Sequence, residues 1–358
     1  MDKNQIFITS GTEYKRMTKE LLEKADLQSH IGDRKKKIGI KPNLVSPSEA
    51  SWGATTHPEV VAGIIEYLKE HGFRDMVMLE GSWVGDKTRE AFETCGFDRL
   101  EEEYQVPFWD MQKDKGISVD CGGMELNVCE RVKELDFLIN VPVLKGHCQT
   151  KITCALKNMK GLIPNKEKRR FHSLGLHKPI AHLNMGIQQD FIVVDNICGD
   201  LDFEEGGNPV PTGRMLLGED PVQLDAYGCR LMGLALEQAP YIQMAEAWGA
   251  GSTRLEEGDV VRLNEPSAAA DYPAPSGAVA ALTRTVQARS ACSACYASLV
   301  RALHTSGVQG LPIAIGQGWR GIPFDGLGIG ACCNYAKERV PGCPPPAEDI
   351  LRVLSARC

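Results

Sequence analysis

Four cysteine positions near the C-terminus have the types and spacing of a metal-ligand set. Cys292 and Cys295 form a C-x₂-C pair in "CSAC", and "GACCNYAKERVPGC" supplies Cys332 or Cys333 and then Cys343. A C-x₂-C pair places two thiols on one ligand face, and four thiolates can hold either zinc or an iron–sulfur cluster. The sequence therefore predicts a metal site formed by Cys292, Cys295, Cys332 and Cys343, with Cys333 as a bystander.

Two features of this set favour a 4Fe-4S cluster, with zinc as the alternative. Pro344 directly follows Cys343, and cysteine–proline junctions recur in iron–sulfur loops, where the missing N–H and fixed φ of proline bound the loop. A zinc ribbon usually pairs two C-x₂-C knuckles, and the second half here lacks one. A thioredoxin-type redox pair in "CSAC" would leave Cys332 and Cys343 without a role.

A basic segment between residues 137 and 189 contains nine Lys/Arg, four His and one acid, in a chain of net charge −7. Lys145 and His147 follow the most apolar strand expected in the chain, and Lys41 and Asn43 follow an earlier strand. Ligands bind at the carboxyl ends of strands in open α/β sheets. These four residues are therefore predicted to converge on an anion-binding crevice.

The crevice residues are assigned roles by their chemistry. Lysines would clamp a carboxylate or phosphate, and His147 would donate a proton because the pKa of histidine is normally closest to neutrality. Lys157 and Asn158, with Lys160, are predicted to reach the anion from the following helix. Asp195 ends another strand and could orient a lysine or transfer a proton. The alternative is a solvent-exposed lysine face with structural histidines.

Two charged segments and one further acid are not assigned a part in the predicted reaction. The acids of "GDLDFEEGG" are expected to form an exposed turn, although they could chelate a divalent cation. The run "NKEKRRFH" is expected to be a mobile loop over the site or solvated surface. Asp225 is expected to orient a side chain or cap an element.

Strands and helices that would position these residues alternate from about residue 36. "KIGIKPNL", "DMVMLEGS", "LDFLINVPVLKG" and "DFIVVDNICG" have strand patterns, "ISVDCGGMELNV" has a hairpin pattern, and "THPEVVAGIIEYLKEHG" has a helical one. This rhythm predicts an α/β fold with a mainly parallel sheet flanked by helices. We expect an α/β domain over 1–264, a linker over 265–284, and a small cysteine-rich α+β domain over 285–358.

Composition narrows the function classes further. The chain has 358 residues, 43% hydrophobic and 24% charged, with no run of eighteen apolar residues and no signal-peptide order at its start. We therefore expect a cytoplasmic protein that spans no membrane. Net charge −7 argues against nucleic-acid binding, and thirteen cysteines in such a protein indicate metal or thiol chemistry. Walker A, dinucleotide-binding, nucleophile-elbow and HExxH motifs are absent from the sequence.

Five separated motifs between about residues 36 and 235 resemble the "domain of unknown function 362" family. They are "KPNLVSP", "THPEVVAGIIEYLKEHG", "INVPVLKGH…KITCALKNMKGLIP", "VVDNICG" and "GEDPVQLDAYGCRLMGL", in that order. The resemblance implies an association with iron–sulfur domains, since members are often linked to them. The chain lacks the ferredoxin-like C-x₂-C-x₂-C-x₃-C-P run, and its tail resembles a different four-cysteine tail of some relatives.

These observations together predict an iron–sulfur redox enzyme that acts on an anionic small molecule, with an electron-donor protein as a further partner. One alternative is a non-catalytic electron-transfer or cluster-sensing module. Another is a transferase-like α/β protein stabilised by zinc.

Overall fold

The computed structural model describes residues 1–265, 277–289 and 291–357. The chain divides into two compact units, Met1–Pro275 and Ser276–Cys358, each with its own hydrophobic core. The predicted linker 265–284 falls at this division: residues 266–276 lie outside the described residues, and helix α11 (Ala278–Leu282) occupies its end.

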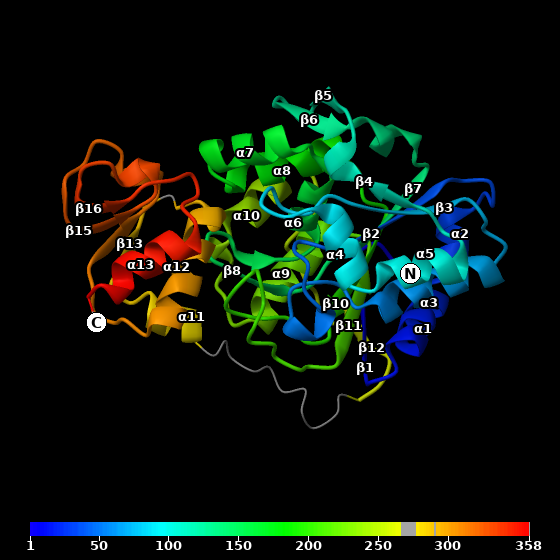
Figure 1. The fold of residues 1–358 in the computed structure, drawn as a ribbon. Coiled ribbons are helices and arrows are strands. Elements are labelled where there is room, and N and C mark those ends of the chain that lie inside the picture. Colours follow the sequence, from blue (N-terminus) through cyan, green and yellow to red (C-terminus); the bar gives the residue numbers. More distant parts are fainter. Residues whose placement is uncertain (266–276, 290, 358) are drawn as a thin grey trace. The chain divides into compact units, whose positions relative to one another are not determined.

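An eight-stranded sheet forms the centre of the first unit (Figure 1), in the order β12-β1-β11-β10-β7-β2-β3-β4. Strand β11 is antiparallel to β1 and β10, and the remaining pairings are parallel. This confirms the predicted mainly parallel sheet, with β7 in its interior. The strands are β1 (Ile6–Ser10), β2 (Ile38–Pro42), β3 (Met76–Glu80), β4 (Phe108–Asp110), β7 (Phe137–Val141), β10 (Phe191–Asn196), β11 (Arg214–Gly218) and β12 (Val260–Arg262).

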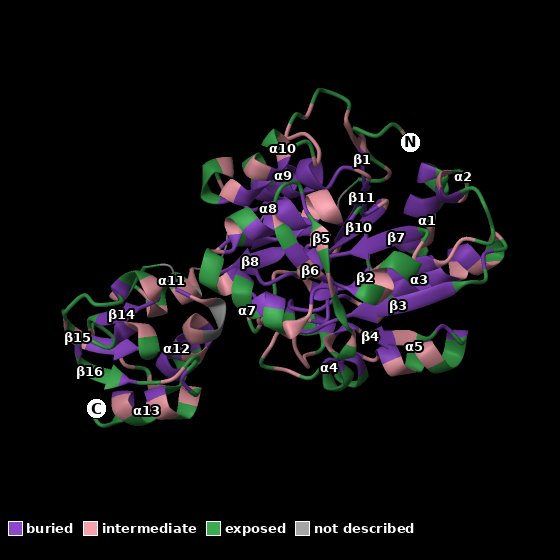
Figure 2. Cartoon of the chain, turned by 90° about the horizontal axis from the view of Figure 1, so that it is seen from above, coloured by how far each residue is buried: buried purple, intermediate pink, exposed green. Residues whose placement is uncertain are grey.

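Helices cover both faces of this sheet because successive strand side chains point to opposite sides. In β10, Phe191 and Val193 pack with one helical layer, and Ile192 and Val194 pack with the other. Figure 2 shows the result as buried strands between helices with exposed outer faces. The first layer comprises α1 (Tyr14–Ala25), α2 (Leu27–Ile31), α3 (Pro58–Glu70), α4 (Thr88–Thr94) and α5 (Phe97–Tyr104). The second comprises α6 (Ala155–Asn158), α7 (Asn165–Leu174), α8 (His177–Gly186), α9 (Pro221–Leu231) and α10 (Pro240–Ala247).

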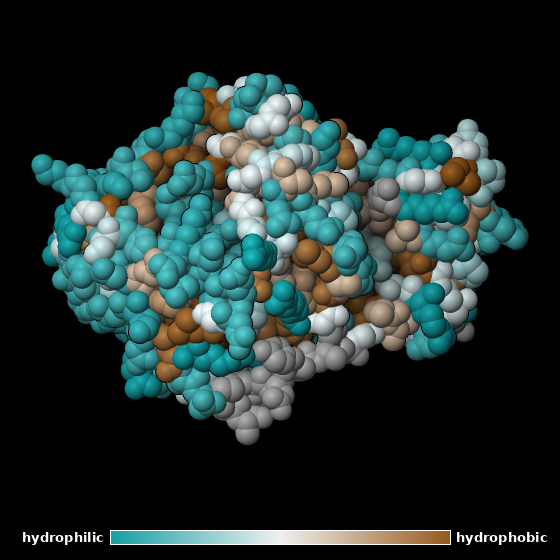
Figure 3. Space-filling model, turned by 180° about the vertical axis from the view of Figure 1, so that it is seen from behind, coloured by the Kyte–Doolittle hydropathy of each residue, from teal (hydrophilic) through white to brown (hydrophobic). Residues whose placement is uncertain are grey.

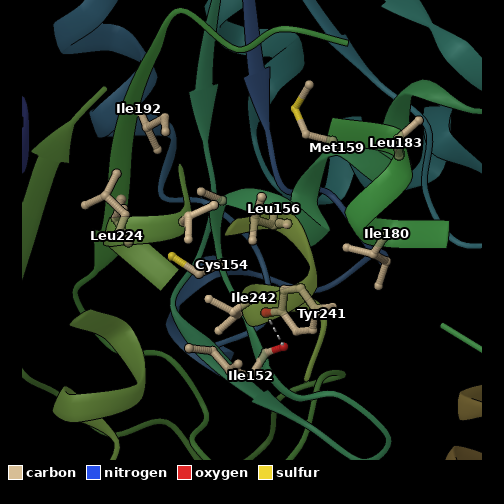
Figure 4. Packing of buried hydrophobic residues seen from close by; sticks show 14 of the residues in the cluster. Ile152, Cys154, Leu156, Met159, Ile180, Leu183, Ile192, Leu224, Tyr241 and Ile242 are labelled. Atoms are coloured by element: carbon tan, nitrogen blue, oxygen red, sulfur yellow. Dashed lines mark hydrogen bonds between the residues drawn. The ribbon is translucent and has the colours of Figure 1, made fainter. Parts of the chain in front are cut away.

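The second layer fixes the helix that carries Lys157. Leu156 of α6 packs among side chains of α8, α9, α10 and β10 (Figure 4). Tyr241 donates its hydroxyl hydrogen to the Asp225 carboxylate at 3.1 Å, and an oxygen of Asp225 accepts the Leu156 N–H at 3.4 Å. Burial raises the pKa of Asp225 to about 7, against the hydrogen bonds that lower it. Asp225 therefore caps and orients, as expected from the sequence.

Two short hairpins complete the first unit. The predicted hairpin is formed by β5 (Gly116–Asp120) and β6 (Glu125–Cys129), and a second, unpredicted one by β8 (Lys145–His147) and β9 (Lys151–Thr153).

The expectation of a mobile loop at "NKEKRRFH" was wrong, because these residues belong to helix α7. Phe171 and Lys168 are buried on one side of α7, whereas Arg169 and Arg170 are exposed. An apolar anchor on one helical face is enough to order a charged segment.

The second unit contains a separate four-stranded sheet in the order β13-β14-β15-β16, and all of its pairings are parallel. This refines the expected α+β layout to a parallel α/β one. Helices α12 and α13 pack on it through Leu299, Leu303, Ile350 and Leu354. The elements are β13 (Val286–Ala288), α12 (Ser293–Ser306), β14 (Ile313–Ile315), β15 (Phe324–Ile329), β16 (Ala336–Val340) and α13 (Ala347–Ser355).

The outer surface is mostly polar. On the face in Figure 3, hydrophilic residues predominate and hydrophobic ones form smaller groups between them. Within the described ranges, no helix has the length and apolar content that a membrane crossing requires.

Candidate functional site

The strand order reverses at β2 and β7, where ligands bind in open α/β sheets, and a buried ion pair lies at this point. Lys41, at the end of β2, donates to Oε2 of Glu80 at 2.7 Å and to the Pro42 carbonyl at 3.1 Å. Both side chains are almost completely buried. Burial lowers the pKa of Lys41, and the charge of Glu80 opposes that effect. The Lys41 ammonium is thus committed to protein partners.

Replacing Lys41 by methionine should destabilise the protein by about 3–5 kcal/mol, because it leaves the Glu80 charge buried without its cation. Urea unfolding measures the loss. The double variant Lys41→Met/Glu80→Gln is the matched control and should recover most of the stability. Equal losses in the single and double variants would contradict a stabilising ion pair.

A second group, here called the basic cluster, consists of Lys145, His147, Lys157, Lys160 and His172. Lys145 and His147 lie in β8, Lys157 in α6, Lys160 in the following 3₁₀ turn, and His172 in α7. Lys157 donates to the Thr153 hydroxyl at 3.1 Å, and Thr153 pairs with Lys145 across the β8–β9 hairpin. The lysines of the cluster also lower the pKa values of His147 and His172, after burial as the main cause.

Electrostatics in the basic cluster disfavour positive charge. Burial, and then the charge of Lys157, lower the pKa of Lys145 to about 7. Burial lowers the pKa of Lys157 to about 8, and burial followed by neighbouring lysines lowers the pKa of Lys160 further below its ordinary value. Burial and the nearby lysines also lower the pKa of His172 to about 3. The Glu204 carboxylate opposes these effects on all three lysines. A site of this kind would be stabilised by an added anion.

His147 faces Glu204 as a neutral imidazole. Its Nδ1 accepts the backbone N–H groups of Gln149 and Thr150 at 3.0 and 3.1 Å, so the ring hydrogen is on Nε2. Nε2 lies 3.6 Å from Oε1 of Glu204. Burial and then the neighbouring positive groups lower the pKa of His147 well below its ordinary value. Any proton that His147 donates at neutral pH therefore comes from a neutral ring.

His147, Cys148 and Glu204 also form a group that could hold a metal ion. Their ligand atoms lie within 4.8 Å of one another. Cys148 donates its backbone N–H to one oxygen of Glu204 at 3.0 Å and its thiol hydrogen to the other at 3.1 Å. A metal on Nε2 would require His147 to give up the two backbone hydrogen bonds at Nδ1, because that nitrogen would then carry the proton.

Not all of the predicted crevice residues lie in the basic cluster. The structure brings together Lys145, His147 and Lys157, whereas Lys41 is paired with Glu80. Asn43 accepts the Val45 N–H at 3.2 Å, in the turn after β2. Asn158 donates to Oδ1 of Asn140 at 2.7 Å, in a buried hydrogen bond between two amide side chains.

Asp195 lies with a different group: its Oδ2 is 2.8 Å from Nδ1 of His57.

Lys145 donates to the backbone carbonyls of Ala54 and Glu204.

Glu204 and Asp200 correct the expectation of an exposed acidic turn, because both are buried. Oxygens of Asp200 accept the backbone N–H groups of Asp202, Phe203 and Asn208, which orders the turn. Glu204 is thereby held against Lys145 and His147. A run of glycines and acids has the pattern of a solvated turn, so the sequence carries no signal for the burial of Glu204 and Asp200. Glu80, in contrast, could have been found from the sequence, because it is a lone carboxylate at the end of an apolar strand.

The four predicted cysteine ligands come from three loops at one edge of the small sheet. Cys292 caps α12 after β13, and Cys295 lies in the first turn of that helix. Cys332 lies in a 3₁₀ turn (Ala331–Cys333) after β15, and Cys343 follows β16. Because β13, β15 and β16 are parallel, their carboxyl ends share one edge of the sheet.

Electrostatic influence between the thiols shows that they are neighbours. Burial, followed by Cys292, Cys343 and Cys332, raises the pKa of Cys295 to about 12. Burial is also the main cause of the raised pKa of Cys292, whose sulfur accepts a hydrogen bond from Gln317 at 3.4 Å. Thiolates would repel one another here, so this donor set fits a cationic group that binds thiolates.

Cys333 differs from its neighbour Cys332. It is 2% exposed, packs with Ala314 and Trp319, and donates its thiol hydrogen to the Ala314 carbonyl at 3.3 Å. Cys332 is partly exposed and influences Cys292 and Cys295 electrostatically, and Cys333 has a smaller influence on Cys295. These positions are consistent with Cys332 as the ligand and Cys333 as a core residue.

Residues 38–230, more than half of the chain, match the family model "Domain of unknown function (DUF362)". The chain belongs to the DUF362 family. The matched segment contains Lys41, the basic cluster and Asp195, whereas the cysteine tail lies outside it.

One curated relative of this DUF362 member is the thylakoid-associated protein sll1697 of Synechocystis sp. (strain ATCC 27184 / PCC 6803 / Kazusa). It is 24% identical over 63% of this chain and 71% of its own. A lactate racemase apoprotein structure from Thermoanaerobacterium thermosaccharolyticum matches with 17% identity and a TM-score of 0.41 over 66% of this chain. A protein structure from Thermotoga maritima matches with 16% identity and a TM-score of 0.40 over 67%. This chain spans 59% of the length of each of those two.

Proposed function

We propose that this DUF362 member is an iron–sulfur redox enzyme that acts on a small anion bound at the basic cluster. The observation that carries the proposal is the gathering of Lys145, Lys157 and Lys160 beside Glu204, with pKa values that burial holds below the ordinary range. Strongly lowered lysine pKa values are typical of functional sites. A carboxylate or phosphate would supply the missing negative charge.

The basic cluster contains groups for both binding and proton transfer. Lys157 and Lys160 are partly exposed and can clamp the anion. Lys145 is 1% exposed and has a pKa of about 7, so it can release a proton near neutrality. His147 would then position the anion through its Nε2 hydrogen, rather than donate from a charged ring as its ordinary pKa suggests.

Cys292, Cys295, Cys332 and Cys343 would hold a 4Fe-4S cluster, which supplies one-electron chemistry when bound. Four thiolates in tetrahedral geometry can also hold zinc, which is the alternative cofactor.

Anaerobic purification followed by metal analysis and electron paramagnetic resonance tests the cofactor. We expect about four iron atoms per chain and, after reduction, a paramagnetic signal. A colourless protein containing one zinc would overturn the redox proposal. Enzyme and electron carrier are distinguished by adding phosphate or succinate: if neither anion binds the cluster-containing protein, the enzyme proposal fails.

A further inference from the structure

A carboxylate, an imidazole and a thiol lie in series where β10 ends. Oδ2 of Asp195 is 2.8 Å from Nδ1 of His57 and also accepts the His57 backbone N–H at 2.8 Å. On the other side of the ring, Nε2 of His57 lies 3.6 Å from Sγ of Cys198. None of these three side chains belongs to the basic cluster or to the cysteine tail.

The hydrogen bonds select the ring form that activates a thiol. Because Asp195 accepts the Nδ1 hydrogen, Nε2 faces Cys198 as the acceptor of the thiol hydrogen. Asp195 is itself fixed, since Oδ1 accepts the Ile197 N–H at 3.1 Å. Tyr14 packs edge-on against the imidazole at 5.3 Å and holds the ring in place.

Charge in this group favours the imidazolium that forms once Nε2 has taken the thiol proton. Burial lowers the pKa of His57, but the charge and hydrogen bond of Asp195 and the thiol of Cys198 together raise it to about 10. Tyr14 of α1 also faces this group, since burial and then the charges of Cys198 and Asp195 raise its pKa. A positive ring beside the sulfur stabilises a thiolate.

The carboxylate is the least exposed member of the series. The side chain of Asp195 is 1% exposed and that of His57 12%, whereas Cys198 is partly exposed at the surface. The carboxylate is therefore shielded, whereas the residue that carries the thiol is partly exposed. Cys198 also lies 3.3 Å from the Ala50 carbonyl, which gives a competing, purely structural role for its hydrogen.

We propose that Cys198 is a nucleophilic thiol that exchanges with small disulfides, activated by His57 and with Asp195 as the positioning residue. The thiol proton moves to Nε2 of His57, and the thiolate attacks one sulfur of R–S–S–R′. A Cys198–S–S–R bond forms as the R–S–S–R′ bond breaks, and the electron pair leaves on R′–S⁻. His57 then protonates that sulfur. The disulfide substrate supplies the oxidising equivalents, so no other reactant is required.

Iodoacetamide labelling followed by peptide mass spectrometry tests activation in the whole chain. Cys148 is an internal control, since its partly exposed thiol donates to the Glu204 carboxylate and lies outside the His57 group. At pH 7 we expect Cys198 to react at least about tenfold faster than Cys148, and His57→Gln to remove that difference. Asp195→Asn should lower the rate partly, whereas Tyr14→Phe, which keeps the ring packing, should leave it unchanged.

Hydroxyethyl disulfide tests the exchange itself. We expect a mixed disulfide at Cys198 in the wild type and none at that position in Cys198→Ser, with circular dichroism verifying that each variant is folded. The proposal is overturned if wild-type Cys198 reacts no faster than Cys148, or if folded His57→Gln retains the wild-type rate. The first comparison needs no variant, so misfolding cannot hide a negative result.

Discussion

Replacing Cys295 by alanine is expected to reduce bound iron from about four atoms per chain to nearly none, because a cubane cluster needs a thiolate on each iron. Cys295 is the most suitable of the four positions for this test. Its thiol is surrounded by Cys292, Cys332 and Cys343, and burial and those neighbours raise its pKa to about 12. Iron and sulfide assays on anaerobically reconstituted protein measure the loss.

Cys333→Ala provides the matched control for this variant. It removes the adjacent sulfur of "CC", which donates a hydrogen bond to the Ala314 carbonyl and packs with Trp319. We expect full iron content and a stability loss of about 1 kcal/mol, typical of a small change in a core. Cys332→Ala should behave like Cys295→Ala. If Cys333→Ala loses the iron and Cys332→Ala keeps it, the ligand assignment is wrong.

The fold was predictable where hydrophobic runs are long and regular. The runs that became β2, β3, β7 and β10 predicted a parallel sheet correctly, since inner strands are apolar on both faces. Strands β1 and β11 were missed. They lie in segments that carry no βαβ rhythm, and β11 runs antiparallel to β1 and β10, a direction that depends on long-range pairing.

The basic cluster was only partly predictable, because strand ends identify an edge of the sheet and not the partner of each side chain. Lys41 and Lys145 both follow apolar strands, yet Lys41 is neutralised by Glu80 and Lys145 donates to backbone carbonyls. The difference arises from which loop folds over each strand end. Glu204 illustrates this, since the turn ordered by Asp200 carries it into contact with His147.

His57 and Cys198 were missed for a related reason. They are 141 residues apart in sequence, and each alone has the pattern of a structural residue. His57 precedes α3 and Cys198 follows β10, and Asp195 fixes His57 beside Cys198 by accepting its backbone N–H as well as its ring hydrogen. The strand-end rule placed Asp195 at the sheet edge, and the three-dimensional contact supplied the other two.

Binding of an anion at the basic cluster is expected to be coupled to proton uptake. Lys145 and Lys157 have pKa values of about 7 and 8, so at pH 8 both are partly neutral in the free protein. An anion favours the charged amines and raises both pKa values. Affinity for phosphate or succinate should therefore decrease as pH rises from 7 to 9. Calorimetry in buffers of different ionisation enthalpy measures the protons taken up.

Replacing Lys157 by alanine should weaken this binding by about tenfold to a hundredfold, the loss of one charge-assisted hydrogen bond. Lys166→Ala is the control: Lys166 is an exposed lysine of the same basic segment and should have no effect. Stability of the free protein provides an independent check. At a pH above its lowered pKa, a lysine in the folded protein binds fewer protons than the same lysine in the unfolded chain. The free energy of unfolding should therefore increase between pH 7 and 10. If Lys166→Ala weakens binding as much as Lys157→Ala, the anion is held by general surface charge and the basic cluster is not its site.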